Sequence, residues 1–343
     1  MRTHVKSRLL VLAALIGLTP GVVLSQSVHQ WLQEVGLSSD DIAKLDEGQP
    51  LVWIPKADDP TEVTLLAIVH IGVTAEDIRG MARDVAGLVR RSEQVLQVGV
   101  FSDDPTWEDA ATLRLPEGDI KDLKKCKVGD CAVRLTASSI ESLHENVIWS
   151  ASDQANQVNG YLAGWLAAYL REYKESGTDA LAVYADKKEM QSVAEGLDIL
   201  LRKTDLLIEY DREFYRYVEN YPAGERPDAE HLFYWTVEDL SLKPTVILHH
   251  MTIRGGEKNH EALMVSKQIY ASHYIQAGVK AYAALPASDD DPSKGVYVLL
   301  TQRLRFDGNV GGIKRKLLED GTKKAARSQL KSFKAYAEAA SGS

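Results

Sequence analysis

The stretch from Lys267 to Leu285 reads KQIYASHYIQAGVKAYAAL, and apolar residues alternate along it. The first alternate set is aliphatic: Ile269, Ala271, Ile275, Ala277, Val279, Ala281, Ala283 and Leu285. The second set is largely polar or aromatic: Tyr270, Ser272, Tyr274, Gln276, Lys280 and Tyr282. Because successive side chains of a strand point to opposite faces, this period of two predicts one long, half-buried strand.

The rest of the C-terminal region predicts a second strand and one long helix. Residues 286–294 form an acidic loop, and the strand expected over 295–307 has this apolar face: Val296, Val298, Leu300, Leu304 and Phe306. From residue 310 to residue 340, apolar or small residues recur every three to five positions: Ile313, Leu317, Gly321, Ala325, Leu330, Phe333 and Ala337. That spacing is typical of one face of a helix, here about 30 residues long.

Length and charge restrict the classes of function. The 343 residues, 45% of them hydrophobic, suffice for one large domain or two small ones. The formal charge of −9 argues against nucleic acid as a partner. Residues 308–343 are an exception, with eight basic and three acidic residues. This basic end favours contact with an anionic membrane surface.

The first 25 residues have the features of an export signal. Three basic residues come first: Arg2, Lys6 and Arg8. The apolar run at 9–18 is too short to cross a bilayer as a helix, and Val23 and Ser25 occupy the −3 and −1 positions of a cleavage site. We therefore expect a mature chain of residues 26–343 that is periplasmic or secreted. An uncleaved anchor is the alternative.

The two cysteines, Cys126 and Cys131, enclose the short segment Lys-Val-Gly-Asp. An exported protein meets an oxidising compartment, and Val-Gly-Asp supplies turn residues, so a disulfide is the favoured interpretation. The alternatives are weaker because Cys-x-x-Cys-His is absent, no histidine lies nearby for zinc, and the spacing is not that of the usual redox motif.

Residues from about 138 to 222 change to a helical period and have strands on both sides, which indicates a helical insertion in an α+β domain. Within it, four aromatic residues share one helix face: Tyr210, Phe214, Tyr217 and Tyr221. A buried aromatic seam is the favoured interpretation, because such faces usually pack against a neighbour. The alternative is one wall of a ligand pocket.

Three polar residues lie on faces that are otherwise apolar: His249, His273 and Gln302. If their strands are neighbours, these side chains can converge in a cavity and bind a ligand, because buried polar groups need partners. The alternative is that each is a core residue bonded to nearby backbone. A metal site of the two histidines lacks a supporting spacing, so we expect no metal.

Gly311 and Gly312 precede Lys314 and Arg315 at the expected start of the long helix. Exposed N–H groups at a helix N-terminus can hold an anion such as a phosphate head group. A tight turn before a solvated basic face is the alternative interpretation. The chain has no Gly-x-Ser-x-Gly and no His-Glu-x-x-His motif, and we expect no cofactor.

Two parts of the chain resemble the helix-grip superfamily of lipid-binding proteins, which includes START-related and polyketide-cyclase-like proteins. The first is the strand expected at 65–71 followed by a helix at 74–89 with Thr74 as its N-cap. The second is the strand–strand–helix ending at 267–285, 295–307 and 310–340. The strings CKVGDC at 126–131, FYW at 233–235 and YASHY at 270–274 also resemble exported bacterial proteins.

The helix-grip resemblance implies an α+β fold in which an antiparallel sheet wraps around the long C-terminal helix and leaves an apolar cavity. It implies a non-catalytic protein that binds a hydrophobic small molecule or lipid. The residues expected at the cavity are His249, His273, Gln302, Tyr270 and Gly321. Two alternatives stay open. One is an enzyme that uses His249 or His273 as general base. The other is an envelope module that docks through its aromatic helical insertion.

Overall fold

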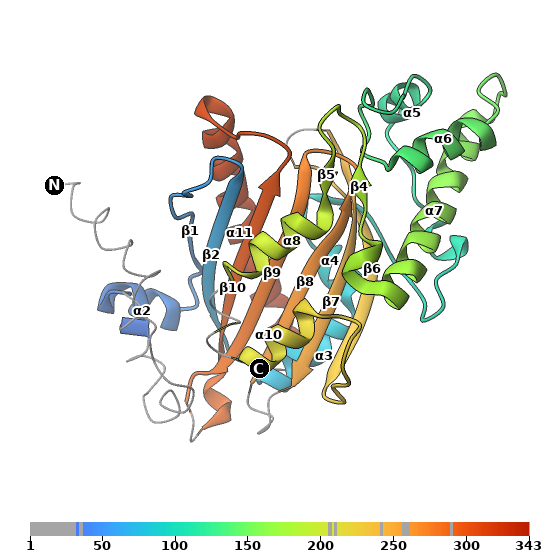
Figure 1. Cartoon of the computed structure of the whole chain (residues 1–343). Helices are drawn as coiled ribbons and strands as arrows, with labels where there is room; N and C mark the ends of the chain where they lie inside the picture. The colour runs from blue at the N-terminus through green and yellow to red at the C-terminus, as the bar shows by residue number, and fades with distance from the viewer. Residues whose placement is uncertain are drawn as a thin grey trace.

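A computed structural model describes residues 32–33, 37–204, 208, 211–240, 243–255, 261–288 and 291–342. It shows one eight-stranded antiparallel sheet with helices on both faces and a long helix at the C-terminus (Figure 1). This confirms the predicted α+β class with an antiparallel sheet and a C-terminal helix. The export signal lies outside the described residues, so cleavage near Ser25 stays a prediction.

The sheet brings the end of the chain beside its beginning. Its strands are β1 (Leu51–Trp53), β2 (Glu62–Ile71), β3 (Val95–Val100), β6 (Ala229–Glu238), β7 (Thr245–Gly255), β8 (Ala262–Ala271), β9 (Ile275–Pro286) and β10 (Val296–Phe306). Their order is β1-β2-β10-β9-β8-β7-β6-β3. The last strand therefore pairs with the second, in a register that runs from Val296 opposite Ile71 to Arg305 opposite Glu62.

One face of the sheet is covered by α3 (Ala75–Arg83), α4 (Val85–Val89) and α11 (Gly312–Ala340), which lie behind the sheet in Figure 1. The predicted N-cap is confirmed, because Thr74 accepts from Asp77 N and the Asp77 carboxylate accepts from Thr74 N. The predicted long helix is also confirmed, since α11 has 29 residues. Its buried side chains Ala326, Leu330 and Ala337 share one core cluster with β2, β10 and α3.

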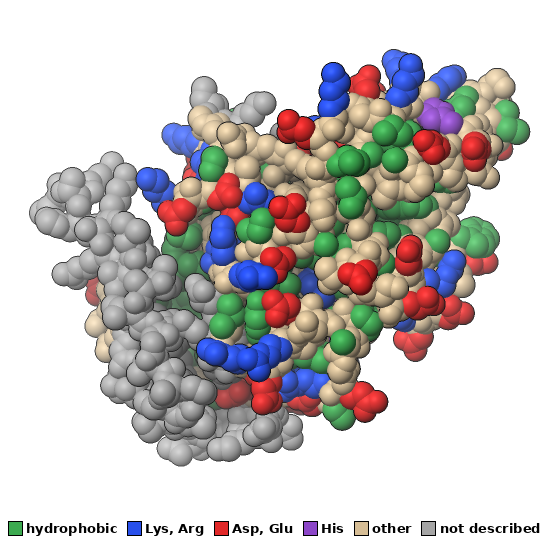
Figure 2. All heavy atoms as spheres, viewed as in Figure 1, with side chains coloured by type: hydrophobic (Ala, Val, Ile, Leu, Met, Phe, Trp, Pro, Cys, Tyr) green, Lys and Arg blue, Asp and Glu red, His purple; other side chains and the backbone are tan. Residues whose placement is uncertain are grey.

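The opposite face is covered by the chain between β3 and β6, which we call the helical block (residues 101–228). It contains α5 (Glu117–Leu123), α6 (Ala137–Asn146), α7 (Gln154–Ser176), α8 (Val193–Leu201), α10 (Arg212–Glu219) and the hairpin β4–β5 (Val183–Tyr184, Gln191–Ser192). A shorter helix, α2 (Ser39–Asp46), packs on the same face against Ile68 and Tyr297. Figure 2 shows acidic and basic side chains interspersed over this side of the molecule.

The single long strand expected over 267–285 is wrong. The chain forms two strands, β8 and β9, joined by a turn at Ser272–Tyr274, where Tyr274 has a φ of 55°. Gln268 pairs with Gly278 and Ala262 with Ala284, so even-numbered residues pair with even-numbered ones across the hairpin. The alternation therefore has the same phase in 262–268 and 278–284, on either side of the turn. The turn itself contains no Gly, Pro, Asn or Asp that would mark it in the sequence.

The expected half-buried strand is also not what forms, because helices cover both faces of the sheet. Every residue of β7 and β8 is buried. Odd-numbered side chains of β8 such as Leu263 and Val265 belong to the core under the helical block, and Met264 belongs to the core under α3 and α11. Polar side chains of these strands are therefore buried as well, which creates the site described next.

Candidate functional site

A cavity of about 90 Å³ lies between the sheet and the helices α3, α4 and α11. All of these elements contribute apolar side chains, among them Ile78, Val85, Met251, Met264, Leu330 and Phe333. α3 ends at Arg83 and α4 begins at Val85, with Asp84 capping both the end of one and the start of the other. This break lets the chain bend around the cavity.

The wall of the cavity that the sheet provides is polar at one end. Lys280 of β9 lies opposite Ser266 of β8, and both line the cavity together with Tyr234 and Tyr282. Burial acts to lower the pKa of Lys280, but the negative charge of Glu238 and the phenol groups of Tyr282 and Tyr234 outweigh it and raise that pKa. Lys280 is therefore a cation at neutral pH.

Glu238, Thr236 and His249 form a hydrogen-bonded group on the same face of the sheet. The Thr236 hydroxyl donates to Glu238 Oε1 (2.9 Å), and His249 Nε2 lies 3.0 Å from Thr236 Oγ1. Burial acts to raise the pKa of Glu238, but the neighbouring His249 ring and the charge of Lys280 hold that pKa at about 2. Burial lowers the pKa of His249, which favours its neutral form.

This arrangement defines the tautomer of His249. Because Thr236 gives its hydroxyl proton to Glu238, its oxygen must accept from His249 Nε2–H. Nδ1 then carries no proton, and it is buried without a hydrogen-bond partner among the residues described. The ring stacks on Tyr234 with centroids 4.4 Å apart. His249 thus supports Tyr234, which lines the cavity, and is not itself part of the lining.

The structure places the other expected cavity residues at different sites. Gln302 lies opposite Lys280 in the register of β10 and β9, so it shares the cavity face of the sheet. Gly321 lies in an earlier part of α11 than Leu330 and Phe333, and a Cβ added to it meets no atom within 4 Å. The α11 wall of the cavity is therefore formed by later turns of the helix.

Tyr270 belongs to the opposite face of the sheet. An irregularity between Leu248 and His249 pairs Leu248 with Tyr270 and His249 with Gln268. This shift turns Tyr270 into the core of the helical block, where its ring lies edge-on to Trp165 and its hydroxyl donates to Arg134 O (3.0 Å). Tyr270 therefore anchors the helical block to the sheet.

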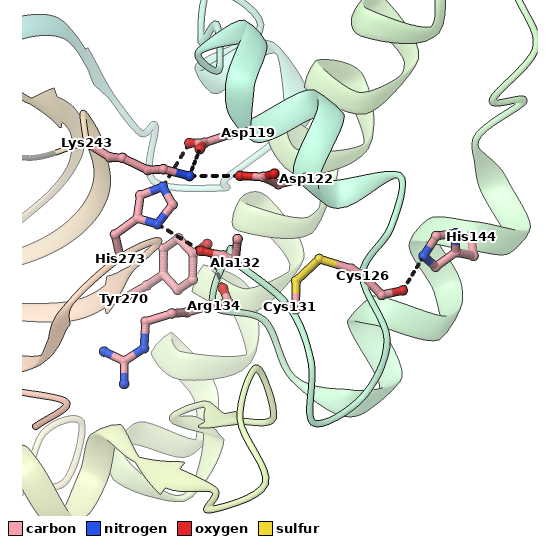
Figure 3. The surroundings of a disulfide bond; sticks show 10 residues. All are labelled: Asp119, Asp122, Cys126, Cys131, Ala132, Arg134, His144, Lys243, Tyr270 and His273. Atoms are coloured by element: carbon pink, nitrogen blue, oxygen red, sulfur yellow. Dashed lines mark hydrogen bonds and ion pairs between the residues drawn. A yellow bond between two sulfur atoms is a disulfide. The ribbon is translucent and has the colours of Figure 1, made fainter.

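His273 lies in the β8–β9 turn and is bonded at both ring nitrogens (Figure 3). Nδ1 lies 3.0 Å from Ala132 O and Nε2 lies 2.8 Å from Asp119 Oδ2. Lys243 approaches the same carboxylate at 3.6 Å. The structure thus joins His273 to the helical block, and does not bring it together with His249 and Gln302.

Cys126 and Cys131 form the predicted disulfide, with Cα atoms 4.4 Å apart. The loop that they close is bonded on both sides: His144 Nε2 lies 2.8 Å from Cys126 O, and Cys131 N donates to Asp186 O (2.9 Å). Figure 3 shows how this loop is joined to His273, which is bonded to the carbonyl of Ala132, the residue after Cys131. The disulfide therefore stabilises the part of the helical block that meets the β8–β9 turn.

At the start of α11, Gly311 is the N-cap and Gly312 has a φ of 58°. The Arg315 guanidinium donates to Val310 O (2.8 Å) and Glu62 O (2.9 Å) and pairs with Glu319 (3.1 Å). Arg315 is therefore engaged with neighbouring backbone and Glu319. The side chain of Lys314 lies outside the described residues. Of the expected anion site, only the backbone N–H groups at the start of α11 are therefore left, and the site stays a prediction.

A second polar group lies under α10, on the face opposite the cavity. Tyr173 OH is 2.8 Å from His250 Nδ1, His250 Nε2 is 2.8 Å from His231 Nδ1, and His231 Nε2 is 2.7 Å from Tyr217 OH. Burial lowers the pKa of His231 to about 4. Phe214, Tyr217 and Tyr221 face inward toward this group or the adjoining core, as a packing seam does, while Tyr210 lies outside the described residues.

The polar wall of the cavity was not found from the sequence. Lys280, Ser266 and Tyr234 are spread over three strands, and alternation assigns Lys280 to a face that was expected to meet solvent. The available signal was a lysine in the nearly uncharged strand Ile275–Pro286. A lysine in such a strand indicates a buried functional cation only if helices cover both faces of the sheet, and the sequence did not show that they do.

Within the described part of the chain, no cluster of three or more His, Cys, Asp or Glu residues is arranged to hold a metal ion. The helices that the structure describes include none with the length and apolar character needed to span a bilayer. No protein-family model matches the chain, and no curated protein matches its sequence.

Proposed function

We propose that this protein binds a hydrophobic small molecule or lipid in the cavity between the sheet and α11, and carries it without chemical change. The observation that carries the proposal is the cavity itself, about 90 Å³ in volume and lined mainly by apolar side chains. A space of about 10–15 Å³ is enough for one water molecule. The cavity is several times larger, which suits a ring or a short acyl chain.

The opening of the cavity supports exchange of a ligand. Arg91 and Gln329 are exposed and line the cavity, so it meets solvent between the end of α4 and α11. The Arg91 guanidinium lies 3.6 Å from the ring centre of Tyr336 and links these two elements. The outer surface of α11 carries exposed basic residues: Lys316, Lys324, Arg327 and Lys331. We infer that this surface meets anionic lipid during exchange.

The affinity expected for an apolar ligand determines the concentration range of the test. Each buried methylene group contributes about 0.8 kcal/mol, so a chain of about six contributes roughly 5 kcal/mol before any head group binds. Dissociation constants between about 1 mM and 1 μM are therefore expected. The mature chain, residues 26–343, is titrated with a solvatochromic apolar dye over that range, and octanol is then added as a competitor.

Filling the cavity provides the decisive variant. Ala82 lines the cavity, so Ala82→Phe places a ring in the space of the ligand and is expected to weaken dye binding at least about tenfold. Ala335 is exposed on α11, and Ala335→Phe serves as the matched control with unchanged binding. Thermal unfolding verifies that both variants fold. Equal binding by wild type and a folded Ala82→Phe protein contradicts the proposal.

A further inference from the structure

The cavity has one cation set into its sheet wall, and we propose that Lys280 binds the carboxylate of an amphiphilic ligand. The preferred ligand is then a single-chain carboxylic acid with its chain between α3, α4 and α11. This inference rests on the proposed function and adds to it the chemical class of the ligand. Its first support is position, because Lys280 lies on the cavity face between Ser266 of β8 and Gln302 of β10.

The second support is that Lys280 lacks a direct partner. Three other lysines of the molecule form ion pairs: Lys187 with Asp307, Lys203 with Glu62 and Lys243 with Asp122. Across the described ranges, no residue accepts a hydrogen bond from Lys280 or approaches it as an ion pair. An ammonium group has three N–H donors, and withdrawal from water is costly unless they are satisfied. An acceptor on the ligand satisfies them.

The third support is that Glu238, whose charge acts on Lys280, is already engaged with other residues. Glu238 accepts from Thr236 at 2.9 Å and lies 3.7 Å from His249 Nε2. Its charge acts on Lys280 without forming a hydrogen bond and, together with Tyr282 and Tyr234, outweighs the effect of burial on the pKa of that ammonium group. The Lys280 ammonium is thus charged, and its N–H donors remain available to an anionic ligand in the cavity.

Two hydroxyl groups complete a site for a carboxylate. Tyr234 OH and Ser266 Oγ lie 3.5 Å apart beside Lys280, and both residues line the cavity. Burial raises the pKa of Tyr234 to about 12, so its hydroxyl keeps its proton and can donate. A carboxylate accepts several hydrogen bonds at once, which matches one ammonium and two hydroxyl donors. A single, partly buried cation also matches one negative charge better than the two of a phosphate monoester.

The test compares ligands that share a chain and differ in their head group. Octanoate, 1-octanol, octylammonium and octyl phosphate are titrated into the wild-type mature protein by isothermal calorimetry at pH 7.5. We expect octanoate to bind about 10- to 150-fold more tightly than octanol, the range typical of hydrogen bonds to charged groups, and octylammonium to bind most weakly. This series needs no variant, so it remains decisive if a substitution prevents folding.

Two variants identify the residue. Lys280→Met retains the length of the side chain and is expected to reduce octanoate affinity to that of octanol, which itself stays unchanged. Lys324→Met removes an exposed lysine of α11 and is expected to leave every affinity unchanged. Equal affinity of the wild type for octanoate and octanol, or undiminished preference for octanoate in Lys280→Met, overturns the inference.

The remaining outcomes separate the inference from the proposed function. Octanol binding without preference for octanoate leaves the apolar cavity in use and overturns only the role of Lys280. Tighter binding of octyl phosphate than of octanoate overturns the carboxylate assignment. Failure of the dye and of every ligand in the series overturns the proposed function together with the inference.

Discussion

Lys267 is the most unusual single residue on the face opposite the cavity. Its side chain is 4% exposed, and Nζ donates to Val218 O of α10 (2.9 Å). The ammonium also lies 5.6 and 5.5 Å from the ring centres of Tyr173 and Tyr221. These contacts do not replace the water that the charge loses, and burial lowers the pKa of Lys267 to about 7.

We predict that Lys267 makes stability depend on pH above neutrality. The unfolded chain has a lysine pKa of 10.5, so between pH 7 and 10.5 it binds more protons than the folded protein. The free energy of unfolding therefore rises with pH, by about 2 kcal/mol from pH 7 to pH 9. Lys267→Met is expected to remove this increase. Urea denaturation at pH 7, 8 and 9 measures it.

The matched variant is Lys324→Met, which removes an exposed lysine and is expected to retain the increase. A Lys267→Met protein whose stability still rises by the same amount shows that other groups cause the pH dependence. The same substitution is expected to stabilise the protein at pH 7, because it removes an ion that is costly to bury.

At the scale of elements, α8 lies in close contact with β9. Ser192 caps α8 by accepting from Glu195 N, and Gln276 of β9 donates to Ser192 O (2.9 Å). Gly196 lies at the point of nearest approach, where an added Cβ falls 2.8 Å from the Cβ of Ala277. The absence of a side chain here is therefore what lets the helix lie on the strand.

We predict opposite effects for two glycine-to-alanine substitutions in helices. Gly196→Ala is expected to destabilise the protein by about 1–3 kcal/mol, because the methyl group overlaps Ala277. Gly160→Ala in α7 is expected to stabilise it by about 0.5–1 kcal/mol, because no atom lies within 4 Å and alanine favours helix. Urea denaturation compares the two. Stabilisation by both substitutions rules out close packing of α8.

At the scale of the whole molecule, charge is distributed unevenly. The chain has a formal charge of −9, yet exposed basic residues follow one side of α11: Lys316, Lys324, Arg327 and Lys331. The cavity opens beside the same helix, at Gln329. The basic side of α11 and the opening of the cavity therefore belong to the same helix.

We predict that α11 binds the mature protein to anionic vesicles. Lys324→Glu, Arg327→Glu and Lys331→Glu together are expected to abolish binding at low salt, since each basic residue near such a surface contributes about 1 kcal/mol. Co-sedimentation with phosphatidylglycerol vesicles measures it. The control has the same charge change on α5 and the residues after it, by Lys121→Glu, Lys124→Glu and Lys125→Glu. Equal loss in both triple variants shows that only net charge matters.

Features with a local cause could be predicted from the sequence. The strand that ends at Ile71, the Thr74 cap, the last strand, the long C-terminal helix and the disulfide each depend on residues close together in the chain. Periodicity, side-chain caps and a short cysteine spacing act over a few residues, so they can be recognised without knowledge of the fold. The hairpin at 272–274 could not be recognised from the sequence. Even-numbered residues pair with even-numbered ones across it, so the alternation of apolar residues has the same phase in both strands.

The sites depended on contacts that no local pattern contains. The helical block of residues 101–228 folds back onto the sheet, so both faces are buried and Lys280, expected on the polar face of a half-buried strand, lines a cavity instead. The one irregularity in β7–β8 pairing decides that Tyr270 faces the helical block while His249 faces the cavity side. Sequence alone thus determined the strand that ends at Ile71, the last strand, the long helix and the cysteine loop, since those preferences are local. Tertiary structure alone decided which faces are covered and which polar groups meet, since that depends on packing between distant segments.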